Sequence, residues 1–322
     1  MDVIRLHAYG PAANLRLETL PDPVPGPGEV RVAVRAAGVH FIETLLRQGR
    51  AVGPHPAPAL PAVFGSEVAG VVEAVGEGVP AGLAGRRVVT GAASSGGYAS
   101  RAVAPAGSLT ELPGHVDDGV AVAMVTTGAT TFGLLELAPV GPGDVVLAMA
   151  AAGGVGSLLV QYARRAGATV VGAAGGPAKA ARAAELGAGL AVDYREAGWD
   201  KRVREAAGEV TVVFDGVGGE LGRAAYGLLG RGGRHVVFGS AAGEWFFPDA
   251  GEAAAREVAV LDGIGHLLGR DGGTADLRAR ALEAAAEGWL TPLVQAFPLA
   301  AAAAAHAALE SRDTMGKVVL VP

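Results

Sequence analysis

The sequence contains no cysteine. Disulfide bonds, thiolate metal ligands and a cysteine nucleophile are therefore excluded, and the composition is typical of a reducing compartment such as the cytoplasm. Aromatic residues make up only 5% of the chain and charged residues only 18%, and the net charge is -6. Because the chain also has no run of basic residues, nothing in it would attract nucleic-acid phosphates. We expect a cytoplasmic protein that does not bind nucleic acid.

Long hydrophobic runs are also lacking. Residues 1–7 have no apolar signal-peptide core, and apolar stretches such as 145–152 stop well short of the roughly 20 residues that a membrane helix needs. We therefore expect no membrane partner. Hydrophobic residues nevertheless make up 50% of the chain, which is enough for real cores. At roughly 150 residues per domain, the length predicts two domains.

Glycine and proline are abundant, with 51 and 19 residues, and they predict many tight turns. In the first part of the chain they separate short strands, which we predict at 30–34, 68–75 and 86–90. One helix is predicted at 41–47, and the proline-rich segment 53–61 is predicted to be a loop. Many short strands with turn residues between them indicate a β-barrel-like domain.

Farther along the chain, apolar strands alternate with helices. The predicted strands are 144–150, 169–174, 210–214, 233–238 and 258–261, and the predicted helices are 156–166, 178–186 and 220–229. Such an alternation indicates a parallel sheet with both faces covered. Helices at 275–287 and 299–309 and a strand at 317–321 complete the chain. The predicted fold class is α/β.

A glycine-rich turn joins the first of these strands to its helix. Residues 151–156 read Ala-Ala-Gly-Gly-Val-Gly. The missing Cβ of Gly153 lets a pyrophosphate approach the backbone, and Gly156 lets the helix pack closely against the strand. The helix N-terminus adds free N–H groups and a positive dipole end. We predict a dinucleotide site that includes Gly154 and Val155; the alternative is a purely structural turn.

The end of the next strand indicates which dinucleotide is bound. An NAD site has an Asp or Glu there, about 20 residues after the glycines, whereas this strand ends Ala-Gly-Gly at 174–176. Without an acid there is room for a 2′-phosphate, which Lys179, Tyr194 and Arg195 can approach. The alternative for each of the three is an ordinary surface position. The sequence thus favours NADPH.

Several motifs together resemble one known family. They are Gly-Val-His-Phe-Ile-Glu-Thr at 38–44, the segment 65–76, Thr-Gly-Ala-Thr at 127–130, Phe-Gly-Ser at 238–240 and Gly-Lys-Val-Val-Leu-Val-Pro at 316–322. With the turn at 151–156, they make nearly the whole chain resemble the medium-chain dehydrogenase/reductase superfamily. The closest likeness is to its zinc-free quinone oxidoreductases, the zeta-crystallin-like group.

The resemblance implies a domain arrangement and a reaction. A GroES-like catalytic domain would comprise residues 1–122 and 265–322, and a Rossmann NADPH-binding domain residues 123–264. The reaction would be hydride transfer to a quinone or an α,β-unsaturated carbonyl, with the proton taken from solvent. Members of the group often form homodimers through the edge strand of the Rossmann sheet, here 258–261.

The resemblance also implies site residues. It places the nicotinamide near His40 and Thr127, the candidate catalytic residues. The candidate cofactor-binding residues, including those derived above, are Thr130, Gly153, Gly154, Val155, Gly156, Lys179, Tyr194, Arg195, Val217, Phe238, Gly239, Ser240 and Lys317.

The chain departs from the family on the substrate side. The family commonly has Asn where this chain has His40, and it often has tyrosines at the positions of Leu45 and Ala51. Two alternatives therefore stay open: an enone or enoyl-thioester reductase in a biosynthetic pathway, and a non-catalytic NADPH-binding protein.

Catalytic zinc is not expected. The positions that match the zinc ligands of related dehydrogenases are His40, Ser66 and Ala123, and Glu67 resembles a buried structural acid. A single imidazole does not provide the three or four protein ligands that zinc requires.

Overall fold

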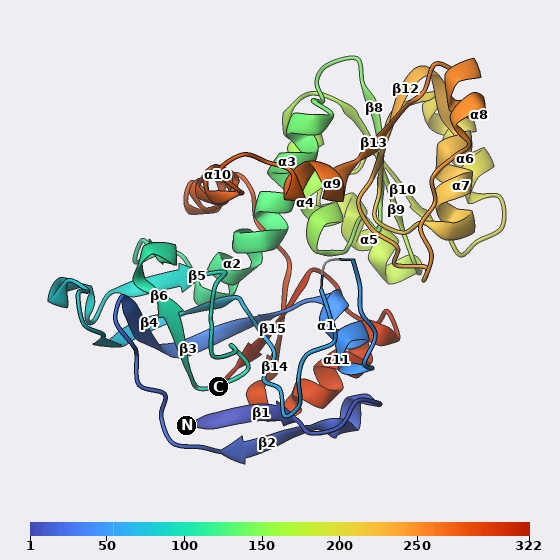
Figure 1. Ribbon diagram of the computed structural model, residues 1–322. Coiled ribbons are helices and arrows are strands. Elements are labelled where there is room, and N and C mark those ends of the chain that lie inside the picture. Colours follow the sequence, from blue (N-terminus) through green and yellow to red (C-terminus); the bar gives the residue numbers. More distant parts are fainter. Residues whose placement is uncertain (54) are drawn as a thin grey trace. The chain divides into compact units, whose positions relative to one another are not determined.

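The computed structural model describes residues 1–53 and 55–322, and the chain forms two compact units (Figure 1). The first unit contains residues 1–126, 285–288 and 293–322, and the second contains residues 127–284 and 289–292. The segment 265–284, which we expected in the catalytic domain, thus belongs to the second unit. The physical reason is packing: Leu277 and Leu267 contact Gly133, and Arg280 stacks over Phe132.

The first unit is built mainly of antiparallel strands. Its strands are β1 (Asp2–Leu6), β2 (Leu15–Thr19), β3 (Glu29–Val39), β4 (Val68–Val75), β5 (Arg87–Thr90), β6 (Arg101–Pro105), β7 (Thr110–Glu111), β14 (Val294–Pro298) and β15 (Lys317–Val321). Its helices are α1 (Phe41–Arg47), α2 (Asp118–Ala123) and α11 (Ala302–Glu310), with short 3-10 turns at 12–14, 81–83, 106–108 and 299–301. The main sheet has the order β14-β15-β3-β4-β5-β7, with β6 also paired to β3, and β1 and β2 form a separate hairpin.

Strand β15 brings the C-terminal segment into this sheet. It pairs antiparallel with β3, so that Val319 lies opposite Gly38 and Val318 opposite Val39. The largest apolar core of the unit includes Leu6, Tyr98 and Leu320. Both ends of the chain therefore contribute to one core.

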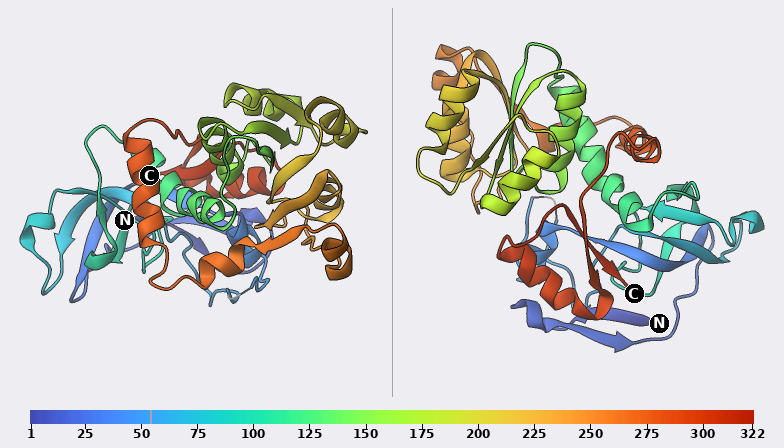
Figure 2. Two further views of the ribbon diagram at one scale, coloured as in Figure 1. Left: turned by 90° about the horizontal axis from the view of Figure 1, so that it is seen from above. Right: turned by 180° about the vertical axis from the view of Figure 1, so that it is seen from behind.

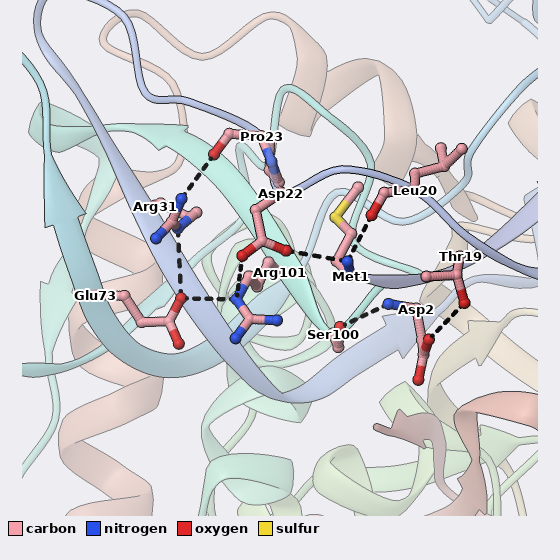
Figure 3. Close-up of polar contacts among 10 residues, drawn as sticks. All are labelled: Met1, Asp2, Thr19, Leu20, Asp22, Pro23, Arg31, Glu73, Ser100 and Arg101. Atoms are coloured by element: carbon pink, nitrogen blue, oxygen red, sulfur yellow. Dashed lines mark hydrogen bonds and ion pairs between the residues drawn. The ribbon is translucent and has the colours of Figure 1, made fainter.

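Polar contacts tie the β1–β2 hairpin to the rest of the first unit (Figure 3). The amino group of Met1 donates to the carbonyl oxygen of Leu20 (2.6 Å) and lies 3.0 Å from Oδ1 of Asp22. Arg101 then bridges Asp22 and Glu73, with its Nε 3.3 Å and 2.9 Å from their carboxylate oxygens. The hairpin was not predicted, because residues 1–20 are too mixed in polarity to show a clear period.

The second unit is a six-stranded parallel sheet. Its strands are β8 (Val145–Met149), β9 (Thr169–Ala174), β10 (Leu190–Asp193), β11 (Val210–Asp215), β12 (Leu229–Val237) and β13 (Ala259–Asp262), in the order β10-β9-β8-β11-β12-β13. Its helices are α3 (Ala129–Leu137), α4 (Gly154–Arg165), α5 (Pro177–Glu185), α6 (Trp199–Ala207), α7 (Gly219–Gly227), α8 (Ala250–Ala255), α9 (Gly263–Leu268) and α10 (Ala275–Ala286). This architecture confirms the α/β class.

Helices cover both faces of this sheet (Figure 2). One apolar core packs α3, α4 and α5 against the sheet through residues such as Leu134, Leu159 and Ala183. The other apolar core packs α6 and α7 against the sheet through Val203 and Tyr226. The strands are buried on both sides, which explains why they are apolar throughout.

Residues 118–137 form one helical run of α2, a π-helical turn (Met124–Gly128) and α3. By length and composition alone this run could cross a membrane, so the expectation that no apolar segment reaches that length was wrong. Most of the run is buried within the protein, and a core helix of a folded domain meets the same criterion.

The predicted elements agree best with the structure where the apolar period of the sequence was clear. The bounds of α1, β4, β9 and β15 are as predicted. Helix α4 begins at Gly154, two residues earlier than expected, and β12 begins at Leu229, four residues before the predicted strand at 233–238. Strands β6 and β14 and helices α2, α6, α8 and α9 were not predicted.

Candidate functional site

The glycine-rich turn lies at the point where the order of the parallel strands reverses. From β8 the chain runs outward to β9 and β10, and it then returns to β11 on the other side of β8. In open α/β sheets, ligands bind outside the carboxyl ends of the strands at such a point. The turn after β8 and the turn after β11 are therefore the two walls of the candidate site.

The turn after β8 is tightly built. Ala150 adopts φ 51°, a left-handed conformation that costs an L-residue roughly 1–2 kcal/mol and is typical of functional sites. A Cβ at Gly156 would lie 2.3 Å from the carbonyl oxygen of Ala150, and one at Gly153 would lie 3.1 Å from it. Glycine at 156 is therefore required by the close approach of α4 to this turn.

Because α4 begins at Gly154, residues 154–156 form its first turn. The backbone N–H groups of a first helical turn have no partner within the helix, and they carry the positive end of the helix dipole. The candidate residues Gly153, Gly154, Val155 and Gly156 are thus brought together in one turn, whose N–H groups are of the kind that suits an anion. This geometry fits a pyrophosphate.

The turn after β9 and the end of β10 are held together by Asp193. Its Oδ1 accepts from the amides of Gly176 (2.8 Å) and Arg195 (2.9 Å). Burial raises the pKa of the Asp193 carboxyl, but these two hydrogen bonds and the charge of Arg195 outweigh burial and lower the pKa. The sequence analysis missed Asp193, although an acid at the end of a short apolar strand was a usable signal.

The same turn brings Tyr194 and Arg195 close to Gly175. A Cβ at Gly175 would lie 3.0 Å from Cε2 of Tyr194 and 3.1 Å from Nε of Arg195. Lys179 follows in the first turn of α5, whose N-cap Gly176 has φ 104°. The structure therefore places Lys179, Tyr194 and Arg195 around the turn after β9, where the acid present is Asp193, whose Oδ1 accepts from backbone amides of the turn.

The wall after β11 contains four further candidates of the second unit. Oδ1 of Asp215 accepts from the amides of Val217 (2.8 Å) and Gly218 (2.9 Å). A Cβ at Gly216 would lie 2.8 Å from the ring of Phe238, and one at Gly239 would lie 2.6 Å from the carbonyl oxygen of Gly216. Val217, Phe238 and Gly239 therefore belong to one close-packed pair of turns, which Ser240 continues.

Thr127 and Thr130 lie on the helical run before β8. Thr127 belongs to the π-helical turn, and its carbonyl oxygen accepts from the hydroxyl of Thr131 (2.9 Å). Thr130 is in the first turn of α3 and is half-buried.

In the first unit, His40 belongs to a buried charged cluster with Glu67 and Lys317. Nζ of Lys317 lies 2.6 Å and Nε2 of His40 lies 2.9 Å from Oε2 of Glu67. Nζ also lies 3.2 Å and 3.4 Å from Nε2 and Nδ1 of His40. Glu67 is 0% exposed and Lys317 is 5% exposed, whereas the His40 side chain is partly accessible.

Glycine makes the space for this cluster. A Cβ at Gly38 would lie 2.2 Å from Oε2 of Glu67 and 3.0 Å from Cε of Lys317. Burial raises the pKa of Glu67, but the charges of His40 and Lys317 and their hydrogen bonds outweigh burial, so its pKa lies far below the ordinary 4.5. Glu67 is therefore ionised. An ammonium group has no acceptor, so Lys317 can donate to His40 when His40 carries its proton on Nε2 and accepts at Nδ1. Among the described residues, Oε1 of Glu67 has no hydrogen-bond partner.

A second buried network, which the sequence analysis missed, supports the first. Glu43 accepts from the amide of His40 (2.8 Å), the hydroxyl of Tyr98 (2.6 Å) and the amide of Gly65 (2.9 Å). It thus joins the segment that carries His40 to the one that carries Glu67. Behind it, the Tyr98 hydroxyl lies 3.1 Å from Nε2 of His306.

The zinc-ligand positions lack a ligand set. His40, Ser66 and Ala123 provide one imidazole among them, and residues 1–53 and 55–322 contain no group of three or more His, Cys, Asp or Glu side chains that could hold a metal ion.

Two family models match the chain. The alcohol dehydrogenase GroES-like domain matches residues 26–114, and the zinc-binding dehydrogenase model matches residues 154–286. The quinone oxidoreductase of Salmonella typhimurium is 34% identical over 99% of each chain. The 2-haloacrylate reductase of a Burkholderia species is 33% identical over 98% of each chain.

Solved structures agree with these relatives. The Escherichia coli quinone oxidoreductase complexed with NADPH has a TM-score of 0.88 and 31% identity, and the match covers 100% of both chains. The likeness extends over both units, confirming the GroES-like and Rossmann-type folds. The chain therefore belongs to the medium-chain dehydrogenase/reductase superfamily and, within it, to the zinc-free quinone oxidoreductase group.

Proposed function

We propose that this protein is an NADPH-dependent reductase that transfers a hydride to a quinone or an α,β-unsaturated carbonyl compound. The observation that carries the proposal is the pair of turns at the switch point, together with the cationic and phenolic side chains at the end of β9. Full-length similarity to quinone oxidoreductases supports the same conclusion.

The residues of the second unit fit a dinucleotide. The amides at the start of α4 would bind the pyrophosphate, and the close approach at Gly156 keeps these amides in place. The turns at 215–218 and 238–240 would form the wall toward the nicotinamide. When bound, the cofactor supplies the hydride, and the protein's tasks are to orient the reactants and stabilise charge.

The end of β9 favours NADPH over NADH. A carboxylate that would bind the 2′-hydroxyl and repel a 2′-phosphate is absent at 174–176. Lys179 and Arg195 offer positive charge to the phosphate, and Tyr194 offers a hydroxyl. The NADPH complex of the Escherichia coli relative is consistent with this choice.

We place the oxygen of the quinone or carbonyl substrate at the partly accessible side of the cluster formed by His40, Glu67 and Lys317. Lys317 holds three protons on Nζ, and one that neither Glu67 nor His40 accepts can be donated to an oxygen on which negative charge develops, while His40 keeps the ammonium group in place. Glu67 orients both basic groups through Oε2. The proton that completes the reduction comes from solvent.

The relatives favour two kinds of acceptor. The Salmonella relative is named for quinones and the Burkholderia relative for 2-haloacrylate, an alkene conjugated to a carboxylate. Hydride addition to either places charge on a conjugated oxygen, which is the charge that the His40 cluster can stabilise. A homodimer and a cytoplasmic location stay predictions.

The proposal is tested by following NADPH oxidation with simple quinones, small enones, 2-chloroacrylate and crotonyl-CoA. Turnover of quinones or enones is expected, whereas preference for crotonyl-CoA would indicate the enoyl-thioester alternative. NADPH binding without turnover of any acceptor would indicate the non-catalytic alternative.

Variants of His40 test its role in the reduction of the substrate. His40→Ala removes the ring that keeps the Lys317 ammonium group in place, so kcat/KM should fall about two- to tenfold. His40→Asn keeps a donor and should lose less, and His115→Ala, an exposed position, serves as the control. Unchanged kinetics in His40→Ala would show that His40 does not act on the substrate.

A further inference from the structure

A cluster of buried polar groups lies within the second unit, behind the turn that follows β11. Asp215, His235 and Tyr226 are all buried, at no more than 2% exposure. In the part of the chain that the structure describes, Oδ2 of Asp215, both ring nitrogens of His235 and the hydroxyl of Tyr226 have no hydrogen-bond partner. Buried polar groups without partners are rare, and each one calls for an explanation.

His235 and Asp215 are each other's polar neighbours. Nε2 of His235 lies 3.5 Å from Oδ2 of Asp215. The parallel register of β11 and β12, with Val213 opposite His235, sets this approach. The imidazole otherwise packs against the rings of Tyr226 and Phe246, with centroids 5.6 Å and 5.8 Å away. An aliphatic side chain would suit such surroundings better, so the imidazole indicates a polar role toward Asp215.

The other oxygen of Asp215 holds the turn. Oδ1 accepts from the amides of both Val217 and Gly218, and Gly218 has φ 71°. The carboxylate packs closely against Gly222, where an added Cβ would lie 2.3 Å from Oδ2. It therefore has little room to rotate. The direction of Oδ2 therefore determines where Oδ1 points and where the backbone of the turn lies.

We propose that His235 is a positioning residue for the dinucleotide site. Its Nε2 attracts Oδ2 of Asp215 electrostatically across 3.5 Å, so that Oδ1 keeps the amides of Val217 and Gly218 in the turn at the switch point. The link to the cofactor rests on the proposed function, whereas the effect on the turn does not. His235 does not touch the cofactor and acts through Asp215.

The test compares three variants without cofactor, by amide hydrogen exchange resolved for Val217 and Gly218. His235→Leu removes the donor, and exchange of these two amides should become about tenfold faster. The amides of β8 serve as the internal reference for global opening. His235→Gln keeps a donor and should exchange like the unsubstituted protein. Tyr226→Phe is the matched control, because it removes a hydroxyl of the same cluster and leaves the Asp215–His235 pair in place.

NADPH titrations of the same proteins test the link to the cofactor. The dissociation constant should rise about tenfold in His235→Leu, with little change in kcat and none in Tyr226→Phe. Should His235→Leu not fold, His235→Met gives the same comparison with a more flexible side chain.

Equal exchange at Val217 and Gly218 in His235→Leu and the unsubstituted protein would overturn the proposal. Faster exchange with unchanged NADPH affinity would overturn the link to the cofactor. Failure of the unsubstituted protein to bind NADPH would refute the proposed function, and the exchange comparison would still decide the role of His235.

Discussion

At the scale of single residues, the cluster of His40, Glu67 and Lys317 depends on one carboxylate. Oε2 of Glu67 is the shared partner of two basic groups, and the almost complete burial of Lys317 leaves its ammonium little access to water. A buried ion pair contributes modestly to stability, but the loss of one partner is costly because the other charge stays buried alone.

Glu67→Gln should therefore lower the free energy of unfolding by about 3–5 kcal/mol, measured by urea denaturation at pH 7.5. Lys317→Met should have a similar effect, and the double variant should be more stable than either single variant because no charge is left unpaired. Glu111→Gln, at an exposed position, should change stability by less than about 0.5 kcal/mol. Additive losses in the double variant would contradict the pairing.

His306 makes stability depend on pH. Burial, and to a lesser extent the charge of Arg47, lower its pKa from 6.5 to about 3. Between these values the unfolded chain binds a proton that the folded protein does not, so stability must fall as the pH falls. From pH 7.5 to 5.0 this residue should account for a loss of about 2 kcal/mol.

Thermal or urea unfolding of His306→Gln at both pH values measures this contribution. The variant should lose about 2 kcal/mol less than the unsubstituted protein over the same pH interval. His115→Gln, at an exposed position, should keep the full pH dependence. The same loss of unfolding free energy between pH 7.5 and 5.0 in all three proteins would show that His306 is not the responsible group.

At the scale of elements, the ends of parallel strands and the starts of helices form the site. Two glycines follow strand β9, and α5 then begins with Pro177 at its first position, where proline favours the start of a helix. Lys179 is consequently placed in the first turn, beside the end of β10 that carries Arg195. Local sequence determines this arrangement, which is why it could be predicted.

Lys179→Ala should weaken NADPH binding about ten- to a hundredfold, since a hydrogen bond to a charged group is worth roughly 1.5–3 kcal/mol. NADH binding should change little, because it has no 2′-phosphate. Fluorescence titration with both cofactors measures the effect, and Lys201→Ala, exposed on α6, is the matched control. Equal affinity of the unsubstituted protein for NADPH and NADH would refute the assignment.

At the scale of the whole molecule, the parallel sheet ends at β13, which pairs only with β12 in the strand order of the described residues. Its residues Val260 and Leu261 are only partly buried. An exposed apolar edge invites pairing with another chain, and a two-fold dimer that extends the sheet covers it symmetrically.

Val260→Asp should therefore convert dimers to monomers, measured by light scattering at micromolar concentration. The charge would be buried against its symmetry mate if the two edges paired. Leu268→Asp, at an exposed position off the sheet, should leave the assembly unchanged. A strictly monomeric unsubstituted protein would contradict the prediction.

The sequence by itself determined what is local. The apolar strands, the turn at 151–156 and the missing acid at 174–176 each lie within a few residues, so they predicted the parallel sheet and the dinucleotide site. Elements such as β6 and α8 were not predicted, since their sequences Arg-Ala-Val-Ala-Pro and Ala-Gly-Glu-Ala-Ala-Ala show no distinct apolar period.

Only the tertiary structure decided which distant residues meet. His40 and Lys317 are 277 residues apart in the sequence, and they meet because β15 pairs with β3 in the register that sets Val319 opposite Gly38. His235 likewise faces Asp215 through the register of β12 on β11. A strand's register depends on long-range packing and hydrogen bonding, which no short segment of sequence contains, so these two clusters could be found only in the folded chain.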